Sequence, residues 1–128
     1  MDRKAGAVIK LEIKGRPSPW ANQPHEGIWR ECIASQARAA LLTAHAKEVI
    51  PKRVEIEFRM LPGRRGDLDN LAKPVLDTLF RQSRKSLHPV ACIFECDDCK
   101  LEELILRRTR VDTAQAEGAT IIMDLSQE

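Results

Sequence analysis

The segment from Arg64 to Leu79 concentrates polar chemistry between two apolar elements of this 128-residue chain. Two arginines and a glycine precede Asp67 and Asp69, and an apolar run with helical spacing follows. Alternate side chains of an extended segment point the same way, so an extended Asp67-Leu68-Asp69 would bring both carboxylates together and turn Leu68 into the core. Paired hard oxygen ligands suit Mg²⁺ or Mn²⁺. The spacing therefore indicates half of a divalent-metal site.

Such a site needs more ligands, and Asp97-Asp98 is the best candidate for the other half. Lys73 lies four residues after Asp69, within helical reach of it. Beside a metal, its ammonium could neutralise charge on a phosphorane-like transition state or position the attacking water. Asn70 could hold a carboxylate or a metal-bound water in place. Together these residues predict hydrolysis of a phosphodiester.

A simpler interpretation uses the same residues. Asp69 could cap a helix, Asp67 could sit in a turn, and Lys73 could make a surface ion pair. Two carboxylates one residue apart are common before helices, and a solvated loop is the default for Asp97-Asp98. Spacing alone does not decide between a metal site and an ordinary helix terminus.

Several stretches resemble the signature of RusA-type Holliday junction resolvases. The resemblance is close over residues 64–79 and loose over most of the remaining chain. The segment between Leu79 and Asp97 is longer than the family pattern. The matching stretches are Gly66-Asp67-Leu68-Asp69-Asn70-Leu71, Lys73, Leu76-Asp77-Thr78-Leu79, Asp97-Asp98 and, in character, Gly15-Arg16-Pro17-Ser18-Pro19.

The resemblance implies a small homodimeric, Mg²⁺-dependent endonuclease, often of phage or prophage context, that nicks two strands of a four-way DNA junction symmetrically. By position, Asp67, Asp69 and Asp98 would be the catalytic metal ligands. Asp97 would be an adjacent contributor and Lys73 the catalytic lysine. Two symmetric cuts require two sites related by a two-fold axis, as in a C2 dimer. Phosphodiester hydrolysis requires an activated water and charge neutralisation, which a metal provides.

Charge is unevenly distributed along the chain. The net charge is +2, but all 21 Lys and Arg and 15 of the 19 acidic residues lie in residues 1–110, a local balance of +6. Such a balance suits a nucleic-acid partner. Arg64 and Arg65 are the strongest candidates for phosphate contacts, because they immediately precede the metal ligands. Further candidate DNA contacts are Lys14, Arg16, Arg81, Arg84, Lys85, Arg107 and Arg108.

The amino-acid composition argues against a base-stacking nucleic-acid-binding protein and against a membrane protein. Two Trp, three Phe and no Tyr are too few rings for a base-stacking platform. No apolar run reaches membrane-spanning length, and the first residues lead into no signal-type segment, so we expect a cytosolic protein without a membrane partner.

The cysteines invite comparison with a zinc site. Soft ligands at short spacing suit Zn²⁺, but these spacings match no standard zinc module. In the cytosol the four cysteines should be reduced, so we interpret them as partly buried thiols. The residues concerned are His88, Cys92, Cys96 and Cys99, with Cys32 farther away.

Apolar periodicity predicts one α+β domain over residues 1–128. Alternating residues predict strands, and helical spacing predicts helices from Ile28 to about Lys47 and after Asp69. Pro74 is unfavourable in a helix interior, so the regular second helix is expected to begin after Asp69. Residues 101–111 fit either a helix or a strand. We expect a two-layer sandwich, with helices near 28–47 and 69–82 on a mixed sheet of strands 7–14, 53–61, 102–110 and 119–125.

Two other functions compete with the endonuclease. One is a non-catalytic DNA-junction-binding or phage regulatory protein that keeps the fold. The other is a phosphotransferase of the haloacid-dehalogenase type, in which the first aspartate directly follows a hydrophobic strand. Here residues 62–66 intervene, which counts against the phosphotransferase.

Overall fold

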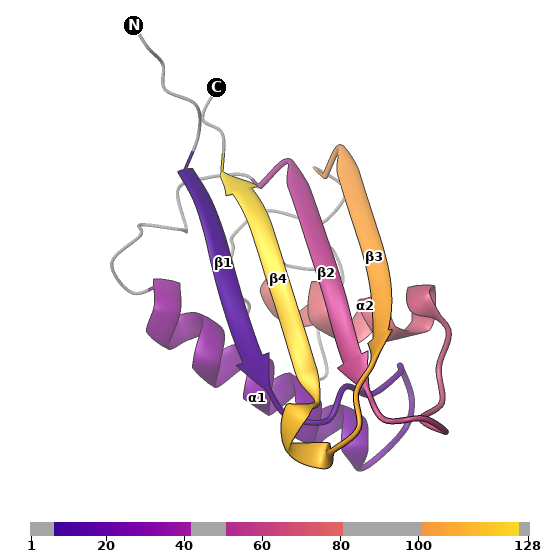
Figure 1. Ribbon diagram of the computed structural model, residues 1–128. Coiled ribbons are helices and arrows are strands. Elements are labelled where there is room, and N and C mark those ends of the chain that lie inside the picture. The colour runs from indigo at the N-terminus through magenta and orange to yellow at the C-terminus, as the bar shows by residue number, and fades with distance from the viewer. Residues whose placement is uncertain (1–6, 42–50, 81–100, 126–128) are drawn as a thin grey trace, which may run out of the picture.

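The computed structural model describes residues 7–41, 51–80 and 101–125, which form a four-stranded mixed sheet and two helices (Figure 1). This confirms the predicted α+β class with its small mixed sheet. Both helices lie on the same face of the sheet in Figure 1. The elements are β1 (Ala7–Lys14), α1 (His25–Leu41), β2 (Arg53–Met60), α2 (Leu68–Leu79), β3 (Glu103–Arg110), a short 3₁₀ turn η3 (Ala114–Ala116) and β4 (Gly118–Leu125).

The strand order is β1-β4-β2-β3, so the last strand of the chain lies inside the sheet. β4 runs antiparallel to both neighbours, whereas β2 and β3 are parallel. Residues 103–110 form a strand because their backbone pairs along the whole length of β2, from Arg53 opposite Glu103 to Met60 opposite Arg110. This pairing shows that the segment is a strand, although its periodicity fitted a helix equally well.

The core lies between the sheet and the helices. Along β2 every second residue is fully buried, as the alternation predicts. The apolar stripe of α2 packs against the same core, with Leu68 and Leu76 at its partly buried margin. The largest fully buried side chains include Trp29 and Ile33 of α1, Ile56 and Phe58 of β2, Leu71 and Leu79 of α2, Leu11 and Ile13 of β1, and Ile121 of β4.

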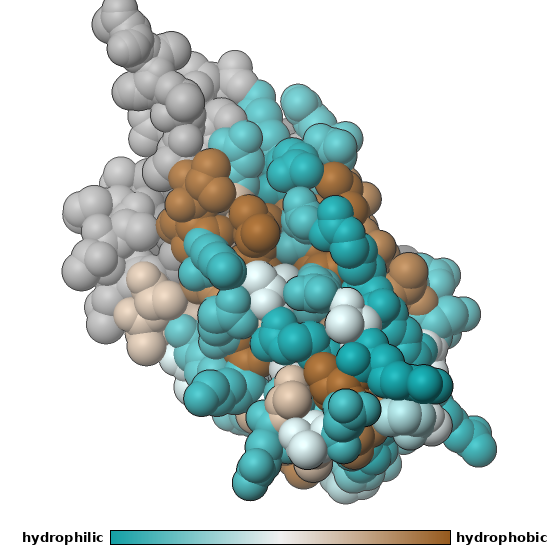
Figure 2. Space-filling model, in the orientation of Figure 1, coloured by the Kyte–Doolittle hydropathy of each residue, from teal (hydrophilic) through white to brown (hydrophobic). Residues whose placement is uncertain are grey.

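The opposite face of the sheet is covered by charged side chains. Figure 2 shows this face as largely hydrophilic, with apolar patches between the charges. Ion pairs run across the strands, and Arg107 of β3 pairs with Glu55 of β2, while Arg59 reaches Glu12 of β1 at 3.3 Å. The charges on this face largely neutralise one another. No helix within the described ranges is long and apolar enough to cross a membrane.

α1 begins at His25, three residues before the predicted start at Ile28. Backbone carbonyls of the preceding loop accept its first N–H groups, since Asn22 accepts from Glu26 at 2.8 Å. The Gln23 side chain accepts from the Gly27 N–H at 3.3 Å, so Gly27 belongs to the helix rather than to the loop. The predicted part of this helix beyond Leu41 lies outside the described residues.

α2 contains Pro74 in its interior, and the prediction that the helix begins after Asp69 is wrong. A proline has no N–H to donate to the carbonyl four residues earlier, which here is that of Asn70. That backbone carbonyl instead accepts a hydrogen bond from the backbone N–H of Trp20 at 3.0 Å. The missing helical bond therefore becomes the attachment point of the loop between β1 and α1.

Gly118 tests how tightly β1 and β4 pair. A Cβ at this position would lie 2.3 Å from the Ile13 carbonyl oxygen, a backbone atom that cannot move without opening the sheet. We expect Gly118→Ala to lower the free energy of unfolding by about 3 kcal/mol, at the upper end of overpacking costs. Chemical denaturation measures this.

Gly27→Ala is the matched control. Its added Cβ would meet only the Gln23 side chain at 3.4 Å, and alanine is the better helix former. Unfolding free energy should stay equal or rise by up to about 1 kcal/mol. Equal destabilisation by the two variants would contradict the close approach at Gly118.

Candidate active site at the start of the second helix

Asp67 and Asp69 lie at the N-terminus of α2, and both are exposed. The expectation of one extended segment is wrong for Asp69, because the helix begins at Leu68. Asp67 alone has an extended backbone (φ −86°, ψ 172°) and caps the helix, its Oδ1 accepting the Asn70 N–H at 3.3 Å. The free N–H groups of a helix N-terminus favour negative charge there. Helix geometry, rather than strand alternation, therefore positions the two carboxylates.

The pair offers oxygen donors to a hard cation. Asp67 uses one carboxylate oxygen as the cap, and the Asp69 carboxylate has no hydrogen bond or ion pair with any residue that the structure describes. Within those ranges no group of three or more His, Cys, Asp or Glu residues could hold a metal. Asp97 and Asp98 lie outside the described residues, so the predicted second half of the site stays a prediction.

The loop between β2 and α2 is fixed by a buried carboxylate. Glu117, just before β4, accepts hydrogen bonds from Nε and Nη2 of Arg64, both at 2.9 Å. It also accepts the Leu61 N–H at 2.9 Å. These bonds hold the pKa of the Glu117 carboxyl below its ordinary value and raise the pKa of Arg64. No local pattern in the sequence points to Glu117, which lies 53 positions along the chain from Arg64.

Arg108 holds the other side of this loop. Its Nη1 donates to the Gly66 carbonyl at 2.7 Å and its Nη2 to the Arg64 carbonyl at 2.6 Å. Arg64 and Arg108 were both predicted to contact DNA. Their contacts in the structure position the segment that carries Asp67, and a DNA contact by either stays a prediction.

Gly66 lets the loop after β1 pack against the site. Its φ is +113°, and a Cβ there would lie 2.9 Å from Cβ of Pro19. Glycine tolerates this backbone region without steric cost. The residue before Asp67 is therefore where the 15–24 loop and the loop into α2 touch.

Lys73 makes no ion pair with Asp69, although it lies within helical reach of that residue. Its Nζ lies over the Trp20 ring, 5.4 Å from the centroid. Trp20 itself is 55% exposed and is anchored to α2 through its N–H bond to Asn70. One turn farther along α2, burial raises the pKa of Asp77, opposed by the charges of Arg30 and Lys73.

A buried polar network joins α1, α2 and the loop before α1. Arg30 donates through Nε to Thr78 Oγ1 at 3.0 Å, and its Nη1 lies 3.9 Å from Glu26 Oε2. Glu26 Oε1 in turn accepts the Ala21 N–H at 2.8 Å. Burial lowers the pKa of Arg30, with the nearby carboxylates opposing it. Sequence reasoning missed this network, because Glu26 and Arg30 look like surface residues of a helix.

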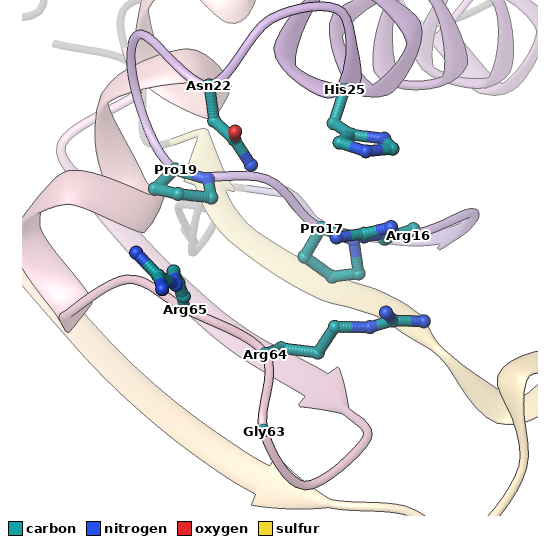
Figure 3. A pocket seen from close by; sticks show the side chains of 8 residues that line it. All are labelled: Arg16, Pro17, Pro19, Asn22, His25, Gly63, Arg64 and Arg65. Carbon is teal, nitrogen blue, oxygen red and sulfur yellow. The ribbon is translucent and has the colours of Figure 1, made fainter.

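The structure gathers three of the candidate DNA contacts in one pocket. Arg16, Arg64 and Arg65 line a pocket of about 360 Å³ beside the loop into α2 (Figure 3). Lys14 and Arg107 point to the opposite, charged face of the sheet, and Arg107 is paired there with Glu55. Arg81, Arg84 and Lys85 lie outside the described residues.

The cysteine-rich segment also falls outside those residues, including His88, Cys92, Cys96 and Cys99. Cys32 in α1 is described and forms no disulfide. Burial raises the pKa of its thiol, and the charge of Glu31 adds to this. Cys32 is thus held as an uncharged thiol.

No protein-family model matches the chain, and no curated protein matches it. The functional interpretation therefore depends on the residues around the start of α2 and on their contacts.

Glu117→Gln should destabilise the protein in a pH-dependent way. Because the folded state lowers the pKa of this carboxyl, its stabilisation is complete above the ordinary value of 4.5 and is lost as pH falls through the folded value. We expect a loss of about 2 kcal/mol at pH 7 for hydrogen bonds to a buried charge. The difference from the unsubstituted protein should shrink below pH 4.5. Urea denaturation across this range measures it.

Glu31→Gln, on the exposed side of α1, is the control for a lost carboxylate. It should change stability by less than about 0.5 kcal/mol at every pH. A Glu117→Gln effect that stays constant or grows in acid would contradict the assigned role of Glu117.

Arg108→Met and Arg107→Met form a matched pair on one strand. Arg108 bonds two loop carbonyls, so its loss should speed hydrogen exchange at the Leu61 and Arg64 amides by at least about tenfold. Arg107 lies on the other face, and its substitution should leave these amides unchanged. Equal effects from both variants would refute the positioning role of Arg108.

Proposed function

We propose that the protein is a metal-dependent endonuclease that nicks four-way DNA junctions. The observation that carries the proposal is the exposed pair Asp67 and Asp69 at the start of α2, which follows a restrained loop beside a pocket lined by arginines. Carboxylates for a cation next to guanidinium groups for phosphate are what phosphodiester hydrolysis requires. The resemblance of residues 64–79 to RusA-type resolvases supports a junction as the DNA substrate.

The carboxylates fit a hard cation. Mg²⁺ usually keeps several waters and needs only one or two protein carboxylates, so the cap bond of Asp67 leaves it able to act as a ligand. Asp67 and Asp69, with Asp97 and Asp98 as further donors, would hold Mg²⁺ or Mn²⁺. When bound, the metal supplies an activated water and neutralises charge on the phosphate oxygens.

Lys73 is placed to keep its charge available. A carboxylate partner would cancel much of the positive charge, whereas an aromatic ring holds an ammonium without neutralising it. With Nζ over Trp20, Lys73 can approach a non-bridging phosphate oxygen and stabilise the charge that develops there. Asn70 is exposed beside it on α2 and can donate an amide hydrogen bond to a carboxylate or a water.

Symmetric cleavage also requires a second active site. In this proposal the protein acts as a homodimer on cytosolic DNA, each copy nicking one strand. The haloacid-dehalogenase alternative is further disfavoured, because β2 ends at Met60 and Asp67 belongs to the helix cap rather than to a strand end. Junction binding without cleavage is the remaining alternative.

A junction-cleavage assay tests the proposal. A labelled four-way junction is incubated with the protein with and without Mg²⁺, and we expect paired symmetric nicks only with the metal. Asp69→Asn should reduce nicking at least about 100-fold while junction binding survives, because it removes one anionic ligand. Asp67→Asn should behave likewise and still fold, since asparagine caps a helix as well as aspartate does.

Asp112→Asn is the matched control, because Asp112 is exposed outside the site, and its nicking rate should equal that of the unsubstituted protein. Nicking that persists in Asp69→Asn would refute the site. Binding without nicking under Mg²⁺ or Mn²⁺ would instead establish the non-catalytic alternative.

A further inference from the structure

The pocket beside the active-site loop has features that the proposed cleavage does not use. Figure 3 shows it between the loop after β1, which carries Arg16 and Asn22 and leads to His25 at the start of α1, and the loop into α2, which carries Arg64 and Arg65. Its volume of about 360 Å³ is at the lower end of the range for small-ligand sites.

The pocket carries uncompensated positive charge. Arg64 is committed to Glu117 through two hydrogen bonds. Neither Arg16 nor Arg65 has a hydrogen bond or ion pair with another residue in the described ranges, and no lining residue is acidic. Arg16 is close enough to Glu117 to contribute to lowering its pKa, but that carboxylate is already bonded. Guanidinium groups gathered in this way attract an anion.

The other lining groups narrow the class of anion. A guanidinium presents a planar fork of N–H donors that matches the oxygens of a phosphate. Asn22 and His25 add side-chain hydrogen-bonding groups on the wall that faces Arg64 and Arg65. Pro17 and Pro19 contribute flat apolar surface, against which the sugar attached to a phosphate could pack.

The walls are fixed before any ligand arrives. Ser18 is fully buried between the two prolines, and the loop is tied to α2 by the bond from Trp20 to Asn70. The facing wall is held by Arg108 through the Arg64 and Gly66 carbonyls. Little ordering is left for a ligand to impose, which favours binding.

We infer that this pocket binds one phosphate group, held jointly by Arg16 and Arg65. For the source of that phosphate the inference rests on the proposed function. Arg65 lies two residues before Asp67, so a DNA strand passing the carboxylates would place a neighbouring backbone phosphate in the pocket. Asn22 and His25 would supply further hydrogen bonds to the same group.

The salt dependence of junction binding tests whether one phosphate is shared. Binding is measured without divalent metal, on junctions lacking terminal phosphates, for Arg16→Ala, Arg65→Ala and the double variant. Each neutralised phosphate contributes about 0.9 to the slope of log K against log salt. Because both arginines hold one phosphate, the double variant should lose about 0.9 in slope in total, and each single variant should lose less, since the remaining arginine still neutralises that phosphate.

Arg110→Ala removes an equal charge from an exposed position outside the pocket, and its slope should stay unchanged. Thermal unfolding confirms that each variant is folded. A double-variant loss of about 1.8 would mean two separate phosphates and would overturn the inference. A loss in Arg110→Ala equal to that of the double variant would overturn it too, since general charge would explain both.

Inorganic phosphate separates this inference from the endonuclease proposal. Phosphate, but not chloride at equal ionic strength, should shift the NMR signals of the Arg16 and Arg65 side-chain Nε–H groups, and the double variant should lose both signals. A shift without any effect on junction binding would support the pocket and assign it to a free or terminal phosphate. If the protein binds no junction, the endonuclease proposal fails and the phosphate titration alone decides. No shift and no shared slope would refute the pocket.

Discussion

The buried Glu117 carboxylate is the contact on which the candidate site depends. It sits beside the start of β4, a strand inside the sheet, and accepts three hydrogen bonds from the loop that leads into α2. A buried charge must be paired and hydrogen-bonded to be tolerated. Moving Arg64 or the loop backbone away from Glu117 would therefore destabilise the folded state. The position of Asp67 is thereby tied to a strand that is paired on both sides.

A second constraint acts from the helix itself. Pro74 removes one helical hydrogen bond and frees the backbone carbonyl of Asn70, which then accepts a hydrogen bond from the backbone N–H of Trp20. The Trp20 ring in turn carries the Lys73 ammonium. A residue that weakens the helix therefore assembles the loop, the aromatic ring and the proposed catalytic lysine into one unit.

Charge is compensated on the outer face of the sheet but not in the loops around the pocket. One face is covered by ion pairs between neighbouring strands, such as Arg59 with Glu12, and its charges largely cancel. The loop after β1 and the loop into α2 bring together arginines around the pocket, and few acidic groups neutralise them there. The two exposed carboxylates lie next to these arginines. Charge separation of this kind directs a polyanion to one edge of the molecule. Net charge alone could not reveal it.

Local patterns in the sequence determined the elements and the motif. Alternation found β1 and β2, and helical spacing found both helices, because one-sided burial imposes these periods. Gly118 marked the start of the apolar segment that forms β4. The sequence also identified Asp67, Asp69 and Lys73 as candidate site residues. Residues 103–110 could not be assigned from periodicity, because β3 has no fully buried side chain to show a period, and only pairing with β2 made them a strand.

Tertiary structure decided how these residues are used. It made Asp67 a helix cap, placed Lys73 over a ring from another loop, and committed Arg64 to a carboxylate more than fifty positions away. Such contacts join distant parts of the chain and leave no local period to detect. The sequence determined which chemistry is available, and the fold decided which charges remain free to perform it.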